Sequence, residues 1–204
     1  MVPLDLIAPA VLRRRAVVVA VGGTVLALLV GALAGLLTDP TAGTVLFVVI
    51  GVPPWLLSFA ESRRRTWLAG TEIGVRALST TKVDLTQLTD LGVLVSQVRG
   101  IRTVGLLVTC GRSTVTVPLA AYAERGIREL DLLALRKLAD ALIATGQPSA
   151  LVFSELLVAQ LRAEARGAGL DERPLFLLAA AAQEGRLAQR LGHDVVSRFV
   201  ASME

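Results

Sequence analysis

The sequence predicts a membrane-spanning helical hairpin joined to an α+β domain. Two apolar runs without charge, 16–37 and 44–59, follow each other closely near the N-terminus. Short runs rich in Val, Leu and Thr come next and are typical of antiparallel strands, and the remainder has the apolar period of amphipathic helices. We therefore expect four parts: an N-terminal segment (1–15), a two-helix hairpin (16–60), an antiparallel β unit (61–120) and a helical region (121–204).

The two apolar runs are long enough to be transmembrane helices. A bilayer core of ~30 Å needs about 20 helical residues, and residues 16–37 provide 22 without a charge. The second run reaches 19 residues when it is extended over 42–60. Both should be helical, because backbone groups in hydrocarbon must be paired internally. Asp39, Pro40 and Gly43 predict a turn between them.

Arginine triplets flank the hairpin and predict its orientation. The triplets are Arg13, Arg14 and Arg15 before the first run, and Arg63, Arg64 and Arg65 after the second. Short flanks rich in Arg stay on the cytoplasmic side of a membrane, so we expect a two-pass protein of a bacterial inner membrane with both termini cytoplasmic. Basic residues beside a membrane also attract anionic lipids, and the six arginines are our candidate lipid-contact residues.

The first run has two other interpretations. It could be a cleaved signal peptide, with Ala32-Leu33-Ala34 as the cleavage site. It could also be part of a buried hairpin in a soluble protein. The run is long for a signal peptide and a second apolar run follows at once, whereas soluble helices are seldom uncharged on every face. Both observations favour the membrane hairpin.

The hairpin contains candidate packing residues. Small residues recur every fourth position in the first run and let helices approach closely in lipid: Gly23, Ala27, Gly31 and Gly35. This stripe would pack on the second helix or on another chain, and the sequence leaves both open. Pro53 and Pro54 predict a kink in the second helix. Neither run contains an ionisable residue, so transport through the hairpin alone is not expected.

The β unit has five expected strands, at 75–78, 82–85, 91–98, 104–110 and 114–119. Gly111 lies between the last two, which favours a hairpin. Several segments together resemble the small bacterial PH-like domains found behind transmembrane hairpins: Arg65-Thr66-Trp67-Leu68, Gly74-Val75-Arg76, Lys82-Val83-Asp84-Leu85, 104–108 and 115–119. The resemblance implies a partly open barrel closed by a helix and used for assembly or lipid contact. It implies no catalytic residues.

The C-terminal region should form four helices. Apolar spacing predicts helices over 129–145 and 149–166. Asp171 is expected to cap a third helix that ends at Gly192, and Asp194 to cap a short fourth one. These helices should pack on the β unit or on each other, and a groove for a partner is the alternative.

The sequence contains few candidate catalytic or metal-ligating residues. Cys110 is the only cysteine and His193 the only histidine, so a cysteine zinc site or an intrachain disulfide cannot form. We expect Cys110 to be incidental and His193 to lie at a helix boundary. Phosphate-loop and dinucleotide motifs are missing from the sequence. We therefore expect no catalytic, cofactor or metal site.

These observations lead to a prediction of function. Most of the net charge of +4 arises beside the hairpin and aromatic residues make up only 4%, which argues against nucleic acid as a partner. We expect a non-enzymatic scaffold or accessory subunit of the inner membrane, with the lipid bilayer, anionic lipids and a protein partner or second copy as its partners. The alternatives are a sensor of lipid headgroups or small molecules, and a subunit of a membrane enzyme or transport complex.

Overall fold

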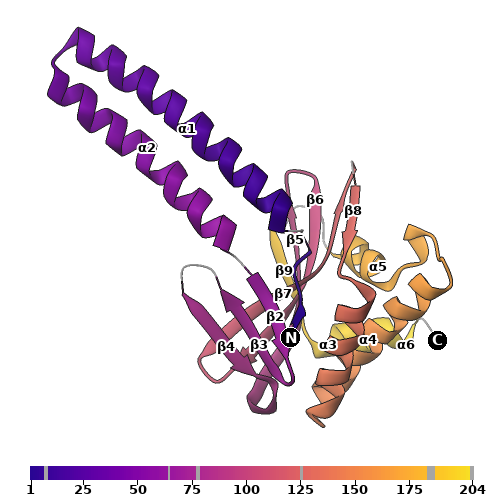
Figure 1. Cartoon of the computed structure of the whole chain (residues 1–204). Coiled ribbons are helices and arrows are strands. Elements are labelled where there is room, and N and C mark those ends of the chain that lie inside the picture. The colour runs from indigo at the N-terminus through magenta and orange to yellow at the C-terminus, as the bar shows by residue number, and fades with distance from the viewer. Residues whose placement is uncertain (7–8, 64, 77–78, 125, 183–186, 203–204) are drawn as a thin grey trace. The chain divides into compact units, whose positions relative to one another are not determined.

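The computed structural model describes residues 1–204 except 7–8, 64, 77–78, 125, 183–186 and 203–204 (Figure 1). The chain divides into two compact units. The helical hairpin comprises 7–64 together with 76–79, and the α+β domain comprises 1–6, 65–75 and 80–204.

The hairpin consists of α1 (Pro9–Leu37) and α2 (Pro40–Arg63). Asp39 caps α2, because its Oδ1 accepts the backbone N–H of Thr41 at 2.5 Å and that of Ala42 at 3.2 Å. The connection is therefore shorter than the expected turn: Pro40 is already the first helical residue, a position that suits its fixed φ angle.

Both helices are long and apolar enough to cross a membrane. The candidate spans are Ala16–Leu37 and Pro40–Ala60, and only 17% of each is buried inside the protein. A core helix of a soluble protein would be mostly buried. The predicted helical hairpin is thus present, with apolar side chains on its outer surface.

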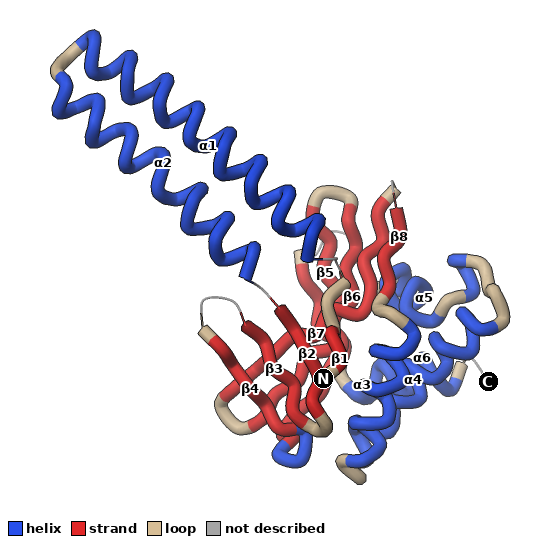
Figure 2. The backbone as a smooth tube through the Cα atoms, viewed as in Figure 1, coloured by secondary structure: helices blue, strands red, loops and turns tan. Residues whose placement is uncertain are grey.

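The α+β domain contains two sheets (Figure 2). The first has the order β1-β2-β3-β4, from β1 (Val2–Pro3), β2 (Arg65–Ala69), β3 (Glu72–Arg76) and β4 (Thr80–Asp84). The short helix η1 (Leu85–Gln87) leads into the second, of order β8-β7-β6-β5-β9. Its strands are β5 (Leu88–Val98), β6 (Ile101–Cys110), β7 (Ser113–Ala123), β8 (Gly126–Glu129) and β9 (Ala188–Leu191).

The centre of the second sheet follows the predicted pattern. β5, β6 and β7 form an antiparallel meander that includes the expected strands 91–98, 104–110 and 114–119. Val115, Val117 and Leu119 are all less than 5% exposed, so the period of two does place one face in the core. In the first sheet β3 begins at Glu72, earlier than expected, and the end of the strand predicted at 75–78 lies outside the described residues.

Within the described residues, four α-helices complete the domain on one side of the strands (Figure 2). They are α3 (Leu132–Ala144), α4 (Pro148–Ala165), α5 (Pro174–Ala181) and α6 (His193–Ala201), with the single turn η2 (Leu170–Glu172) before α5. Asp131 caps α3 by accepting the N–H of Leu133 at 3.1 Å. One continuous core includes residues from both sheets and the helices, such as Ile73, Leu106 and Phe153.

The third and fourth helices differ from the prediction. Asp171 lies inside η2 and does not cap a helix, and α5 starts at Pro174. The expected third helix does not run to Gly192, because β9 stands at 188–191 and pairs with β5, Val93 opposite Leu191. Gly192 instead precedes α6 as its N-cap. Pairing with a buried strand here outweighs the helical preference of Ala-Gln-Arg-Leu.

The N-terminus is part of the α+β domain and not a separate segment over 1–15. Val2 pairs with Leu68 and Pro3 with Trp67. The N–H of Leu4 donates to the carbonyl of Thr66 at 2.8 Å, and the Leu4 side chain is fully buried. The whole hairpin is therefore an insertion between the first two strands of the domain.

Leu4→Ala should lower the free energy of unfolding by about 3 kcal/mol, because it leaves a cavity in the core. Leu133→Ala is the matched control, since Leu133 is 57% exposed, and it should change stability by less than about 0.5 kcal/mol. Denaturant titration of the full chain in detergent micelles measures both. Equal losses would show that β1 is not part of the folded core.

Candidate functional site

The small residues of α1 contact α2. A Cβ atom added to Gly23 would lie 2.6 Å from the Cβ of Pro54. Ala27 is fully buried, and a Cβ on Gly51 would lie 3.4 Å from the Ala27 Cβ. The side chain of Pro54 thus occupies the space that Gly23 leaves.

The two helices approach most closely near the connecting turn. A Cβ on Gly43 would lie 2.5 Å from the carbonyl oxygen of Gly31 and 2.9 Å from the backbone of Gly35. A Cβ on Gly31 would meet the carbonyl oxygen of Gly43 at 2.9 Å. Glycine is required here because backbone lies against backbone. The stripe that the sequence left open between intrachain and interchain packing therefore faces the second helix of its own hairpin.

The prolines lie within α2, which continues through Pro53 and Pro54 to Arg63 as one helix. The next residue, Trp55, links the helices: its Nε1 donates to Thr24 Oγ1 at 2.9 Å, and this hydroxyl donates to the carbonyl of Ala20 at 2.8 Å. In a membrane, this contact would pair polar groups that would otherwise face hydrocarbon.

The arginines beside the hairpin are partly described. Arg14, Arg63 and Arg65 are exposed, and the Arg63 guanidinium lies 4.2 Å from the centre of the Phe59 ring. This distance is that of a cation–π contact. Three predicted lipid-contact side chains lie outside the described residues: Arg13, Arg15 and Arg64.

Gly43→Ala should destabilise the hairpin by about 1–3 kcal/mol, because the added methyl group forces the helix backbones apart. Gly22→Ala is the control on α1, where the methyl group meets nothing within 4 Å, and it should be neutral or stabilising. Unfolding by SDS, followed by tryptophan fluorescence to which Trp55 contributes, measures the difference. Similar behaviour of the two variants would contradict close packing at Gly43.

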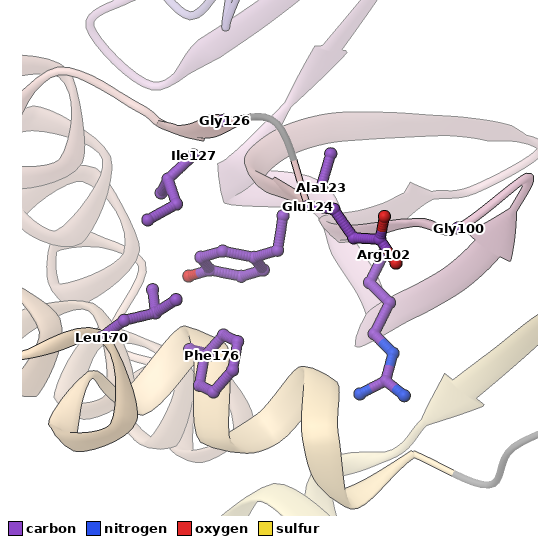
Figure 3. Close-up of a pocket in the computed structure, with 9 residues that line it drawn as sticks. Gly100, Arg102, Ala123, Glu124, Gly126, Ile127, Leu170 and Phe176 are labelled. Atoms are coloured by element: carbon purple, nitrogen blue, oxygen red, sulfur yellow. The ribbon is translucent and has the colours of Figure 1, made fainter.

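The α+β domain has an open hollow of about 530 Å³. Its apolar wall is formed by Tyr122 of β7, Ile127 of β8, Leu170 of η2 and Phe176 of α5. Two charged residues also line it, Arg102 of β6 and Glu124 in the turn after β7. In Figure 3, the side chains of Ile127, Leu170 and Phe176 surround an aromatic ring, and the Arg102 side chain lies on the other side of that ring. The hollow is suited to an apolar group.

The aromatic part of this wall is well packed. The Tyr122 and Phe176 rings meet edge to face, with centroids 5.2 Å apart and planes at 86°, a favourable arrangement. Tyr122 is 5% exposed, whereas Ile127 on the neighbouring strand is 50% exposed. Ile127 thus offers apolar surface beside a packed aromatic pair.

A buried polar network lies behind the wall. The Tyr122 hydroxyl donates to Glu129 Oε1 at 2.8 Å, and Arg173 Nη1 donates to Glu129 Oε2. The same Arg173 nitrogen is 3.9 Å from Glu164 Oε1. The Glu129 side chain is only 7% exposed and that of Glu164 13%, so one guanidinium serves two largely buried carboxyl groups.

Gln160 extends the network to α5. Its Nε2 donates to Glu164 Oε1 at 3.3 Å, and its Oε1 accepts the backbone N–H of Leu175 at 3.1 Å. Arg173 Nε also donates to the carbonyl of Ala168 at 3.3 Å. These bonds attach the start of α5 to α4 and β8.

The surroundings of the network raise the pKa values of two of its side chains, Glu164 and Tyr122. Burial raises the pKa of Glu164, and the hydrogen bond with Glu129 raises it further, whereas Gln160 and Arg173 oppose the shift. Burial and the bond to Glu129 also raise the pKa of Tyr122 above its ordinary range. The arrangement thus makes ionisation of both side chains harder than in water.

Cys110 and His193, the two reactive residue types considered in the sequence, are not part of the hollow or the polar network. Cys110 ends β6, and burial together with the charge of Asp84 raises the pKa of its thiol, the opposite of activation. His193 begins α6, with Nδ1 3.5 Å from Asp194 Oδ1. Within the described part of the chain, no three His, Cys, Asp or Glu residues are grouped as metal ligands would be.

Sequence reasoning missed the network because its members come from separate elements. Tyr122 is in β7, Glu129 in β8, Glu164 in α4, and Arg173 just before α5. One available signal was Gln160, a polar residue at a helical spacing from Phe153 that places it on a buried face.

Comparison with protein-family models, curated proteins and solved structures gives no match for this chain.

Proposed function

We propose that this protein is a non-enzymatic scaffold or accessory subunit of a bacterial inner membrane that presents its α+β domain at the cytoplasmic surface. The pairing of β1 with β2 carries the proposal. These strands precede and follow the hairpin, so both of its ends belong to one folded domain on one side of the bilayer.

The same pairing argues against removal of the first helix as a signal peptide. Cleavage after Ala34 would separate β1 from the rest of the domain. It would also remove Leu4, whose side chain is fully buried in the core. A retained two-helix anchor is consistent with this packing, and the exposed Arg14, Arg63 and Arg65 favour the cytoplasmic orientation and contact with anionic lipids.

Two small sheets followed by α3 support a PH-like interpretation of the β unit. Assembly and lipid contact are the roles that this resemblance implies. Within the domain, the hollow beside Ile127 is the candidate binding surface, where we expect an apolar group of a partner protein. The carboxyl groups of Glu129 and Glu164 accept hydrogen bonds from Tyr122 and Gln160, which supports a non-catalytic use of these acids.

Cysteine labelling in intact cells tests the orientation. In a Cys110→Ser background, a membrane-impermeant thiol reagent should modify Thr38→Cys in the connecting turn. It should modify Arg112→Cys, in the turn between β6 and β7, only after the inner membrane is made permeable. Labelling of Arg112→Cys alone in intact membranes would reverse the proposed orientation.

Photo-crosslinking in native membranes tests the binding surface. Benzoylphenylalanine at position 127 should give a discrete adduct, because Ile127 borders the hollow. The same group at position 133, exposed on α3, is the control and should give none. Phe176→Asp should abolish the adduct, since a charge would replace part of the apolar wall. The same adducts from both positions, or none from 127, would refute partner binding at the hollow.

A further inference from the structure

We propose that Glu164 and Glu129 form a proton-dependent latch that holds α5 against the sheet and thereby regulates the shape of the hollow. The inference rests on the proposed function for its biological meaning, since the hollow is the candidate binding surface. Its physical basis is independent: two carboxyl groups share one arginine in a largely buried site.

The charges in this site balance only when a proton is present. Arg173 supplies one positive charge, and Glu129 and Glu164 supply two negative charges when both are ionised. The excess charge is costly because all three side chains are at least 74% buried, from exposures of 7%, 13% and 26%. One proton on Glu164 makes the site neutral and supplies a donor for a hydrogen bond between the two carboxyl groups.

Neighbouring elements contain few groups that offset this excess. Among the described residues, Glu129 of β8 and Arg173 are the charged groups that act on Glu164. Helices α3 and α6 also pack on α4, but their charged side chains are not among the groups that shift its titration: Arg136, Lys137, Asp140, His193, Asp194 and Arg198. Tyr122 remains neutral because its pKa is raised.

The latch is connected directly to the wall of the hollow. Tyr122 bonds to Glu129 through its hydroxyl and packs against Phe176 through its ring. Arg173 lies immediately before α5, three residues after Leu170 and three before Phe176. A change of charge at Glu164 therefore acts on the residues that hold both sides of the apolar wall.

The effect of pH on the latch follows from the titration of Glu164. Its pKa in the folded protein is raised above the ordinary value of 4.5. The stabilisation from its proton is complete below that ordinary value and is lost as the pH rises through the raised pKa. Lower pH therefore closes the latch, and higher pH loosens α5 and opens the hollow.

The single tyrosine of the chain gives a selective probe. In full-length protein labelled with 3-fluorotyrosine and held in lipid nanodiscs, the ¹⁹F resonance of Tyr122 should show one titration step with its midpoint above pH 4.5, the ordinary pKa of a glutamate side chain. Glu164→Gln keeps the size and hydrogen bonds of the side chain but cannot ionise, so it should abolish the step. No step in the wild type, or the same step in this variant, would overturn the latch.

Two controls and a second measurement complete the experiment. Asp90→Asn, which removes an acid from an exposed ion pair with Arg190, and His193→Gln should both retain the step. Hydrogen exchange of wild-type residues 174–181, corrected for intrinsic rates, should show protection that falls above the midpoint, and constant protection would also refute the latch. A titration step without a crosslinked adduct at position 127 would support the latch but refute partner binding at the hollow. An adduct at position 127 without a titration step would refute only the latch.

Discussion

The backbone pairing of β1 with β2 is the constraint on which the rest of the chain depends. Paired strands lie about 4.8 Å apart, so the ends of the inserted hairpin must return to one place. A single membrane crossing would put the two strands on opposite sides of the bilayer, whereas two crossings bring them together. The tight connection at Asp39 lets α1 and α2 run antiparallel. The chain therefore returns from the hairpin to the same domain whose core contains Leu4.

The hairpin itself needs a different source of stability from that of the α+β domain. In a membrane, apolar side chains would gain little by leaving lipid for a helix interface, so packing and hydrogen bonds would have to hold α1 on α2. The glycines at 31, 35 and 43 allow backbone contact, and Trp55 donates to Thr24 across the interface. In the domain, by contrast, burial of Val, Leu and Phe side chains from water provides the main stabilisation.

The sequence predicts elements whose pattern is local. The apolar runs of the hairpin and the alternation in β7 are examples, because each depends only on residues near one another in the chain. β1 is too short to have a pattern, and β9 has a helical composition and becomes a strand only by pairing with β5. The network has the same limitation: Tyr122, Glu129 and Arg173 are unremarkable polar residues until the fold brings them together.

The network also shows how the domain positions a short helix that has little capping of its own. α5 has only eight residues and no side-chain cap at its N-terminus, so its isolated stability is low. Arg173 and Gln160 attach its first turn to β8 and α4 by hydrogen bonds in a largely buried site. A buried charged network is costly to desolvate, and an apolar contact would hold the helix without a titratable group. The use of two acids and one arginine at this joint makes the position of α5 depend on a proton, in the part of the domain where Phe176 and Ile127 border the hollow.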